Sequence, residues 1–187
     1  MIRASRGARR RAWGVLAELP RTARLLMAPA LISALLLSGL LTAPSRVVAQ
    51  SAPIEDLAHF PRTKVEVHST GKSAETHTFD MWVANTPARS EQGLMFVTEI
   101  PVGRGMIFPV DPPHVMTMWM KNCPSSMDMV FVSTKGRISK IIARAKPQSE
   151  DTLSSDNVVG AVLEIGPGEA ERLHLQVGDA VSWSLSK

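Results

Sequence analysis

The sequence predicts a mainly β fold: a compact, single-domain antiparallel barrel or sandwich with two short helices. Short segments alternate apolar and polar residues with the period of a strand, and few connections between them are long enough to be helical crossovers. No internal repeat is visible. If a leader of 49 residues is removed, 187 − 49 = 138 residues remain, which is enough for one domain with a core.

The first two strands are predicted at residues 63–68 and 79–83. Val65 and Val67 share one face of the first strand, and apolar residues alternate in the same way along the second. The polar segment around Gly71 is expected to join them as a hairpin. A helix over residues 87–95 should follow, because Thr86 is a good N-cap and Pro87 suits the first helical position.

The next elements are expected to be strands, because β-branched and other apolar residues dominate them. Strands 105–110 and 115–120 are separated by the breaker Asp111-Pro112-Pro113. Strands 127–133 and 137–145 form a hairpin around Lys135-Gly136.

The last part of the chain begins with a polar loop. The predicted elements are that loop over residues 147–157, a strand at 158–165, a helix at 168–175 and a closing strand at 179–185.

The first 49 residues have the features of an export signal peptide. They carry eight Arg and one acid (Glu18), a balance of 8 − 1 = +7, before the apolar stretch Leu25–Leu41. Cleavage is predicted after Ala49, which leaves residues 50–61 as a polar linker and 62–187 as the domain. The protein is therefore expected to be periplasmic or secreted. The alternative is an uncleaved membrane anchor, which would be the domain's only contact with the membrane.

The body of the chain carries a small negative charge. Residues 50–187 hold 21 − 8 = 13 Lys and Arg against 17 − 1 = 16 Asp and Glu, a balance of −3. This balance argues against nucleic-acid binding, which needs a basic surface. The single cysteine, Cys123, allows no internal disulfide.

A set of short motifs follows one order and spacing along residues 63–185. They are Thr86-Pro87, Gly93-Leu94-Met95-Phe96, Gly105-Met106-Ile107-Phe108, Trp119-Met120-Lys121-Asn122, Asp128, Val162-Leu163-Glu164, Gly168, Arg172-Leu173 and Gly178-Asp179. In these motifs the chain resembles the prokaryotic domain of unknown function 192 family, also called uncharacterised protein family 0127. The resemblance implies a small β-rich domain, in many members exported, and implies no reaction. The family usually has Thr where this chain has Cys123, and Pro124-Ser125-Ser126 also departs from its pattern.

Polar residues set among apolar strands form the first candidate site. Lys121 and Asn122 stand where a strand runs into a loop, a usual place for binding groups. Asp128 and Glu164 are carboxyls in apolar strands, where burial is costly unless they are paired. The hypothesis is a pocket for a small ligand or an envelope partner; the alternative is a structural Lys–carboxylate pair with Asn122 capping the loop. The candidate ligand-binding residues are Trp119, Lys121, Asn122, Cys123, Asp128 and Glu164.

A second hypothesis is a copper site on the Met-rich strand, because thioether and imidazole groups suit Cu(I). Its ligands would be His114, Met116, Met118 and Met120; methionine packing in the core is the favoured alternative. Apart from copper in this hypothesis, no cofactor is expected. A third hypothesis is an envelope-acting enzyme in which Lys121 works with Asp128 or Glu164 as acid and base.

Cys123 is interpreted as a small buried residue rather than a nucleophile, because no cysteine-hydrolase motif surrounds it. Trp119 and Trp183 are expected in the core.

Overall fold

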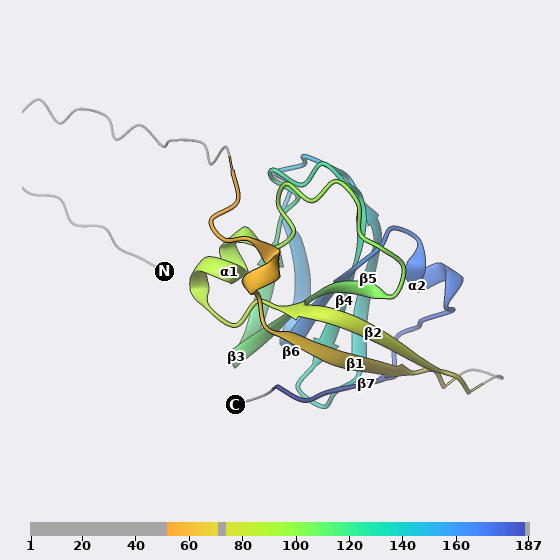
Figure 1. The fold of residues 1–187 in the computed structure, drawn as a ribbon. Helices are drawn as coiled ribbons and strands as arrows, with labels where there is room; N and C mark the ends of the chain where they lie inside the picture. The colour runs from red at the N-terminus through yellow and green to blue at the C-terminus, as the bar shows by residue number, and fades with distance from the viewer. Residues whose placement is uncertain (1–51, 71–73, 186–187) are drawn as a thin grey trace, which may run out of the picture. The chain divides into compact units, whose positions relative to one another are not determined.

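The computed structural model of the protein describes residues 52–70 and 74–185, and the leader predicted at residues 1–49 lies outside them. The described residues form one compact unit built on a single curved sheet (Figure 1). Its seven strands are β1 (Arg62–His68), β2 (Thr76–Val83), β3 (Arg104–Met118), β4 (Met127–Ser133), β5 (Ile138–Ala145), β6 (Leu153–Ile165) and β7 (Ala180–Trp183). The predicted β-rich fold is confirmed.

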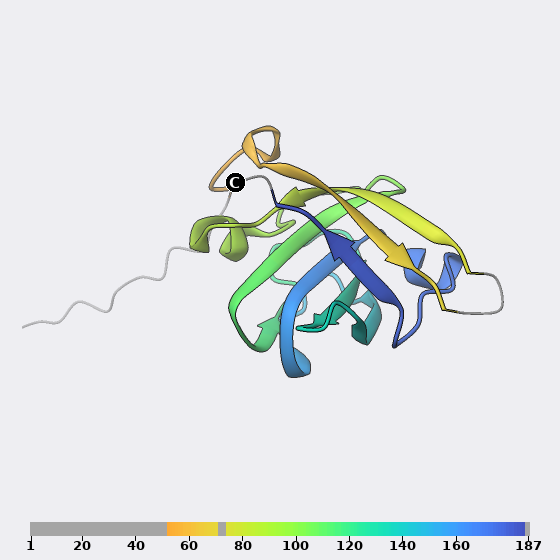
Figure 2. The same ribbon diagram turned by 90° about the horizontal axis from the view of Figure 1, so that it is seen from below.

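The strand order in the sheet is β5-β4-β6-β3-β2-β1-β7. Only β2 and β3 pair in parallel, and every other neighbouring pair is antiparallel. The sheet curls until its two edges approach, and a bridge between Arg137 and Ala180 joins the start of β5 to β7 (Figure 2). The result is a barrel that is partly closed at one end, which leaves fewer free edges than an open sheet would.

Two short helices lie at opposite sides of this barrel (Figures 1 and 2). The first, α1 (Pro87–Gln92), begins as predicted, with the Thr86 side chain accepting a hydrogen bond from the Arg89 N–H. It ends before the predicted residue 95 because Gly93 takes a positive φ of 50°. The second, α2 (Glu169–Arg172), is also shorter than expected. Within residues 52–70 and 74–185, no helix is long and apolar enough to cross a membrane.

The breaker Asp111-Pro112-Pro113 does not end a strand, contrary to prediction. β3 runs through it, and the pairing with β6 shifts register between Pro109 and His114. Proline is tolerated at such a bulge because no ladder hydrogen bond is required of it there. β6 correspondingly starts at Leu153, inside the predicted polar loop, where it pairs with Met118.

Alternate residues of the strands fill two apolar clusters. On β3, Met106 and Phe108 belong to the cluster that also holds Leu94, Met95, Met120 and Cys123. Ile107, between them, belongs to the other cluster, with Ala170 and Leu175 from the α2 region. Each fully buried side chain of this kind stabilises the fold by roughly 1.5–3 kcal/mol.

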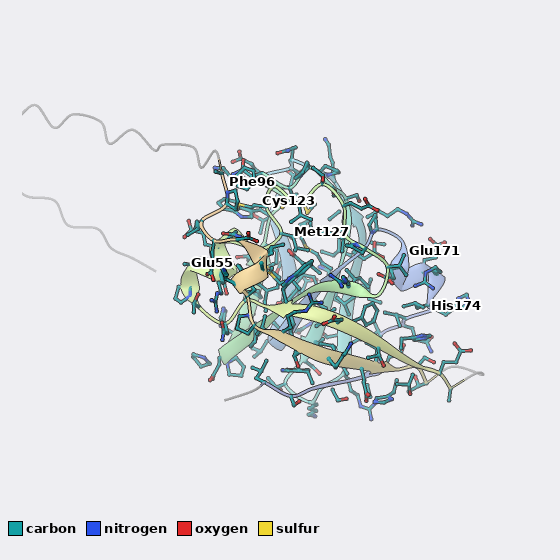
Figure 3. The ribbon with its side chains drawn as sticks, viewed as in Figure 1. Glu55, Phe96, Cys123, Met127, Glu171 and His174 are labelled. Carbon is teal, nitrogen blue, oxygen red and sulfur yellow. The ribbon has the colours of Figure 1, made fainter. Side chains whose placement is uncertain are left out.

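Part of the predicted linker before β1, including Glu55, contacts α1. It contains a 3-10 turn, η1 (Leu57–His59), and Glu55 lies beside α1 (Figure 3). Arg89 donates to both carboxylate oxygens of Glu55, at 2.9 and 2.8 Å. The Gln92 side chain accepts from the Glu55 N–H and donates to the Glu55 carbonyl, each at 2.7 Å. This strap holds a helix too short to be stable alone.

Candidate functional site

A cavity of about 400 Å³ lies between α1 with the loop after it and the strands β3 and β6. Its volume is within the range of small-molecule sites. The wall is largely apolar, and polar side chains gather at its edge and floor. The lining residues are Ser90, Glu91, Gln92, Gly93, Leu94, Met95, Phe108, Met116, Thr117, Met118, Trp119, Cys123, Glu150, Thr152 and Glu164.

Gly93 shapes the wall where α1 ends. Its φ of 50° and ψ of −136° form a conformation that side chains with a Cβ rarely adopt. A Cβ at this position would lie 3.3 Å from the Phe108 ring and 3.8 Å from Oε2 of Glu164. The bare backbone therefore lets the loop pass close to both of these lining residues.

Glu164 is a buried carboxyl inside this largely apolar cavity. The residue is 3% exposed, and no group among the described residues donates a hydrogen bond to its Oε2 atom. The Leu94 backbone N–H donates to the carboxyl and opposes the effect of burial in part. Burial dominates and raises the pKa of Glu164 to about 8, so at neutral pH the group is mostly a neutral acid that can donate a hydrogen bond.

Cys123 lies near Glu164 in the same lining. Burial raises the pKa of its thiol to about 12, and the Glu164 charge contributes in the same direction. The thiol therefore remains protonated and is a poor nucleophile at neutral pH. Figure 3 shows Cys123 close to Phe96 and far from Glu171 and His174 on the α2 side. Its buried position agrees with the interpretation from sequence.

Trp119 is at the mouth of the cavity and not in the core, so that expectation was wrong. It is 45% exposed, while Trp183 is half-buried against the second cluster. The Lys121 ammonium stands 5.2 Å from the centre of the Trp119 ring and 3.9 Å from Oε2 of Glu150. Lys121 thus forms its ion pair with an exposed acid at the cavity edge, Glu150, and not with Asp128 or Glu164 as expected.

Asn122 shapes the loop beside the cavity. It adopts a φ of 57°, and its carbonyl accepts a hydrogen bond of 2.8 Å from the Phe96 N–H. Its side-chain Nδ2 lies 3.8 Å from the Met95 sulfur. These contacts join the loop after β3 to the loop after α1, and both loops supply lining residues.

Asp128 is outside the lining, and its contacts are structural. It is completely buried, and its carboxylate accepts three backbone hydrogen bonds of 2.8–2.9 Å, from the N–H groups of Arg144, Gly168 and Ala170. These contacts tie β4 to the end of β5 and to the start of α2. The grouping of Asp128 with Lys121 and Asn122 in one site is therefore not what the geometry shows.

The four proposed copper ligands occupy different surroundings. Met116 and Met118 line the cavity, whereas Met120 is fully buried in the first cluster. His114 is exposed, with Nδ1 2.9 Å from the Pro112 carbonyl. Across the described residues, no group of three or more His, Cys, Asp or Glu is arranged to hold a metal.

The model of the DUF192 family, described as uncharacterized ACR, matches residues 67–183. The chain belongs to the DUF192 family. A protein of unknown function from Novosphingobium aromaticivorans DSM 12444, known from its crystal structure, is 38% identical to this chain with a TM-score of 0.64. The match covers 72% of this chain and 95% of that one. A candidate transcription regulator from Sinorhizobium meliloti 1021 is 31% identical, also with a TM-score of 0.64, over 66% and 95% of the two chains. No curated protein matches the chain.

Three of the predicted ligand-binding residues line the cavity of this DUF192 protein: Trp119, Cys123 and Glu164. The polar lining residues that come from α1, from β3 and from the segment before β6 were not predicted. The family motifs could have indicated part of this lining, because Gly93-Leu94-Met95 and Phe108 belong to those motifs and also line the cavity. The polar lining residues outside the predicted set are Ser90, Glu91, Gln92, Thr117, Glu150 and Thr152.

Proposed function

We propose that this domain is a small-molecule-binding module and that its ligand occupies the cavity between α1, β3 and β6. The observation that carries the proposal is the unsatisfied Oε2 atom of Glu164 inside an apolar lining. A buried polar group without a partner costs about 1–3 kcal/mol, and a ligand that supplies the missing contact would recover part of this.

The lining supports a ligand with an apolar body and one polar group. Phe108, Met116 and Met118 offer apolar and polarizable surface, and thioether side chains adapt to ligands of irregular shape. Trp119 offers a half-exposed ring at the mouth. A few polar groups that fix orientation within an apolar wall are typical of ligand sites.

The test is a small-fragment screen on the full chain, followed by ligand-detected NMR and thermal shift. Thr117→Trp would place a large ring at the cavity edge, since Thr117 is an exposed lining residue of β3. Val115→Trp is the matched control, because Val115 is exposed on the same strand outside the lining. Binding should be lost in the first variant and kept in the second. Hits that bind both variants equally, or no hits at all, would refute the proposal.

Of the four predicted copper ligands, Met116 and Met118 line the cavity, and the Cys123 thiol lies in the same lining. A thiol whose pKa is raised to about 12 does not readily supply the thiolate that soft metals prefer. Cu(I) titration of wild type and Met118→Leu would reveal such a site. The acid–base enzyme alternative retains only Glu164, because Lys121 pairs with Glu150 and Asp128 accepts backbone hydrogen bonds.

We also propose that the leader directs the protein out of the cytoplasm, on the basis of its charge of +7 and the apolar stretch after it. N-terminal sequencing of the protein from fractionated cells would test cleavage after Ala49. The regulatory role suggested for the Sinorhizobium relative is not extended to this chain, because the balance of −3 on residues 50–187 disfavours contact with phosphates.

A further inference from the structure

We propose that the ligand of this cavity is an organic cation: an apolar molecule that carries an ammonium group, with its charge directed at Glu164. The inference rests on the proposed function and names the class of ligand.

The charges of the lining favour a cation over an anion. Among the described residues that line the cavity, Glu91, Glu150 and Glu164 carry carboxyl groups, and there is no Lys, Arg or His. Glu91 and Glu150 are exposed at the edge, and Glu164 is buried with Oε2 unpartnered. An anionic ligand would have to approach Glu91 and Glu150 at the edge, and above about pH 8 also an ionised Glu164, without a cation in the lining to compensate. Like charges at short range are strongly unfavourable in a site of low dielectric.

A protein ammonium already occupies a cation position at the mouth. Lys121 Nζ lies over the Trp119 ring at 5.2 Å and 3.9 Å from the Glu150 carboxylate, and both of these partners line the cavity. The face of a tryptophan ring attracts ammonium groups, including quaternary ones. The mouth therefore has the chemistry of a cation site, and Lys121 competes there with an incoming ligand.

The buried acid supplies the matching charge inside the cavity. When a ligand cation meets Glu164, the carboxyl gives its proton to solvent and the resulting carboxylate pairs with the ammonium. Because the pKa of free Glu164 is raised to about 8, this exchange makes cation binding stronger as pH rises towards that value. The other titratable groups of the lining are the Cys123 thiol, whose pKa burial raises to about 12, and the Glu91 and Glu150 carboxyls.

Calorimetry on the full chain can test the ligand class with three matched probes: 3-phenylpropyl-trimethylammonium, 3-phenylpropanol and 3-phenylpropanesulfonate. We expect the cation to bind at least about tenfold more tightly than the alcohol near pH 8.5, and the sulfonate to bind most weakly. Affinity for the cation should rise by roughly tenfold or more from about pH 6.5 to pH 8.5, with a proton released.

Three variants sharpen the test. Glu164→Gln keeps the shape of the side chain and should weaken cation binding and abolish its dependence on pH. Lys121→Met should strengthen cation binding several-fold, because it removes the competing ammonium. Lys140→Met is the matched control, since Lys140 pairs with Asp156 away from the cavity, and it should leave the affinity unchanged.

The outcomes separate the two proposals. If the alcohol or the sulfonate binds as tightly as the cation, or if Lys121→Met weakens cation binding, the cation inference is wrong while the cavity remains a ligand site. If none of the probes and no fragment binds in a manner that Thr117→Trp blocks, the proposed function fails as well.

Discussion

The backbone N–H of Leu94, in the loop after α1, lies beside the carboxyl of Glu164 on strand β6 and lowers its pKa, and both residues line the cavity. Its effect does not offset burial, and Oε2 remains without a hydrogen-bond partner among the described residues. The protein therefore keeps a proton on a group that would be ionised in the unfolded chain at neutral pH.

The dependence of stability on pH should reveal that proton. Between the ordinary pKa of 4.5 and the raised value of about 8, the folded protein holds a proton that the unfolded chain has lost. The contribution of Glu164 to stability is therefore full below pH 4.5 and declines as pH rises to about 8, by up to about 1.4 kcal/mol per pH unit. Urea unfolding at a series of pH values should show that the free energy of unfolding falls more steeply with pH in wild type than in Glu164→Gln. Parallel plots of unfolding free energy against pH for the two proteins would contradict this expectation.

Cys123 should react slowly with thiol reagents while the protein is folded. Burial leaves the residue 5% exposed and raises its pKa to about 12, so little thiolate is present near neutral pH. Labelling with a maleimide should be slow in buffer and fast in guanidinium, and Cys123→Ser should not label under either condition. Rapid stoichiometric labelling of the folded protein would show that the thiol is accessible.

Asp128→Ala should destabilise the fold without altering the cavity lining. The change leaves the N–H groups of Arg144, Gly168 and Ala170 without their acceptor, at a cost of about 3 kcal/mol or more. Asp151→Ala is a surface control, since Asp151 is exposed, and it should change stability by no more than about 0.5 kcal/mol. Chemical denaturation measures the free energy of unfolding of both variants. Equal effects would mean that the Asp128 hydrogen bonds contribute no net stability.

Gly93→Ala should cost more stability than Gly103→Ala, although both residues have positive φ angles. A Cβ on Gly103 would meet no atom within 4 Å, so only backbone strain of about 1 kcal/mol is expected. A Cβ on Gly93 would in addition crowd the Phe108 ring at 3.3 Å, for a total of about 2–3 kcal/mol. Thermal and urea unfolding of the two variants provide the comparison. A smaller effect at Gly93 would show that the Phe108 ring can move aside.

Local patterns predicted the strands well, because alternation and turn residues are properties of short segments. They failed at Asp111-Pro112-Pro113, where pairing with β6 carries the strand through a bulge that no local rule reveals. For the site, the sequence pattern indicated that Glu164 is a carboxyl that is costly to bury, but it led to a predicted site that also contained Asp128. Asp128 accepts hydrogen bonds from three backbone N–H groups, whereas Glu164 lines the cavity and its Oε2 has no partner among the described residues. The groups around each carboxyl come from other segments of the chain, which no local pattern reveals.

The strap formed by Glu55 has a practical consequence for where the domain is taken to begin. The sequence placed that boundary at residue 62, and the family match starts at residue 67. A protein shortened to either position would lack Glu55, which pairs with both Arg89 and Gln92 of the six-residue helix that forms one wall of the cavity. Ligand studies on such a truncation would examine a differently shaped opening, and an absence of binding to it would not represent the intact protein.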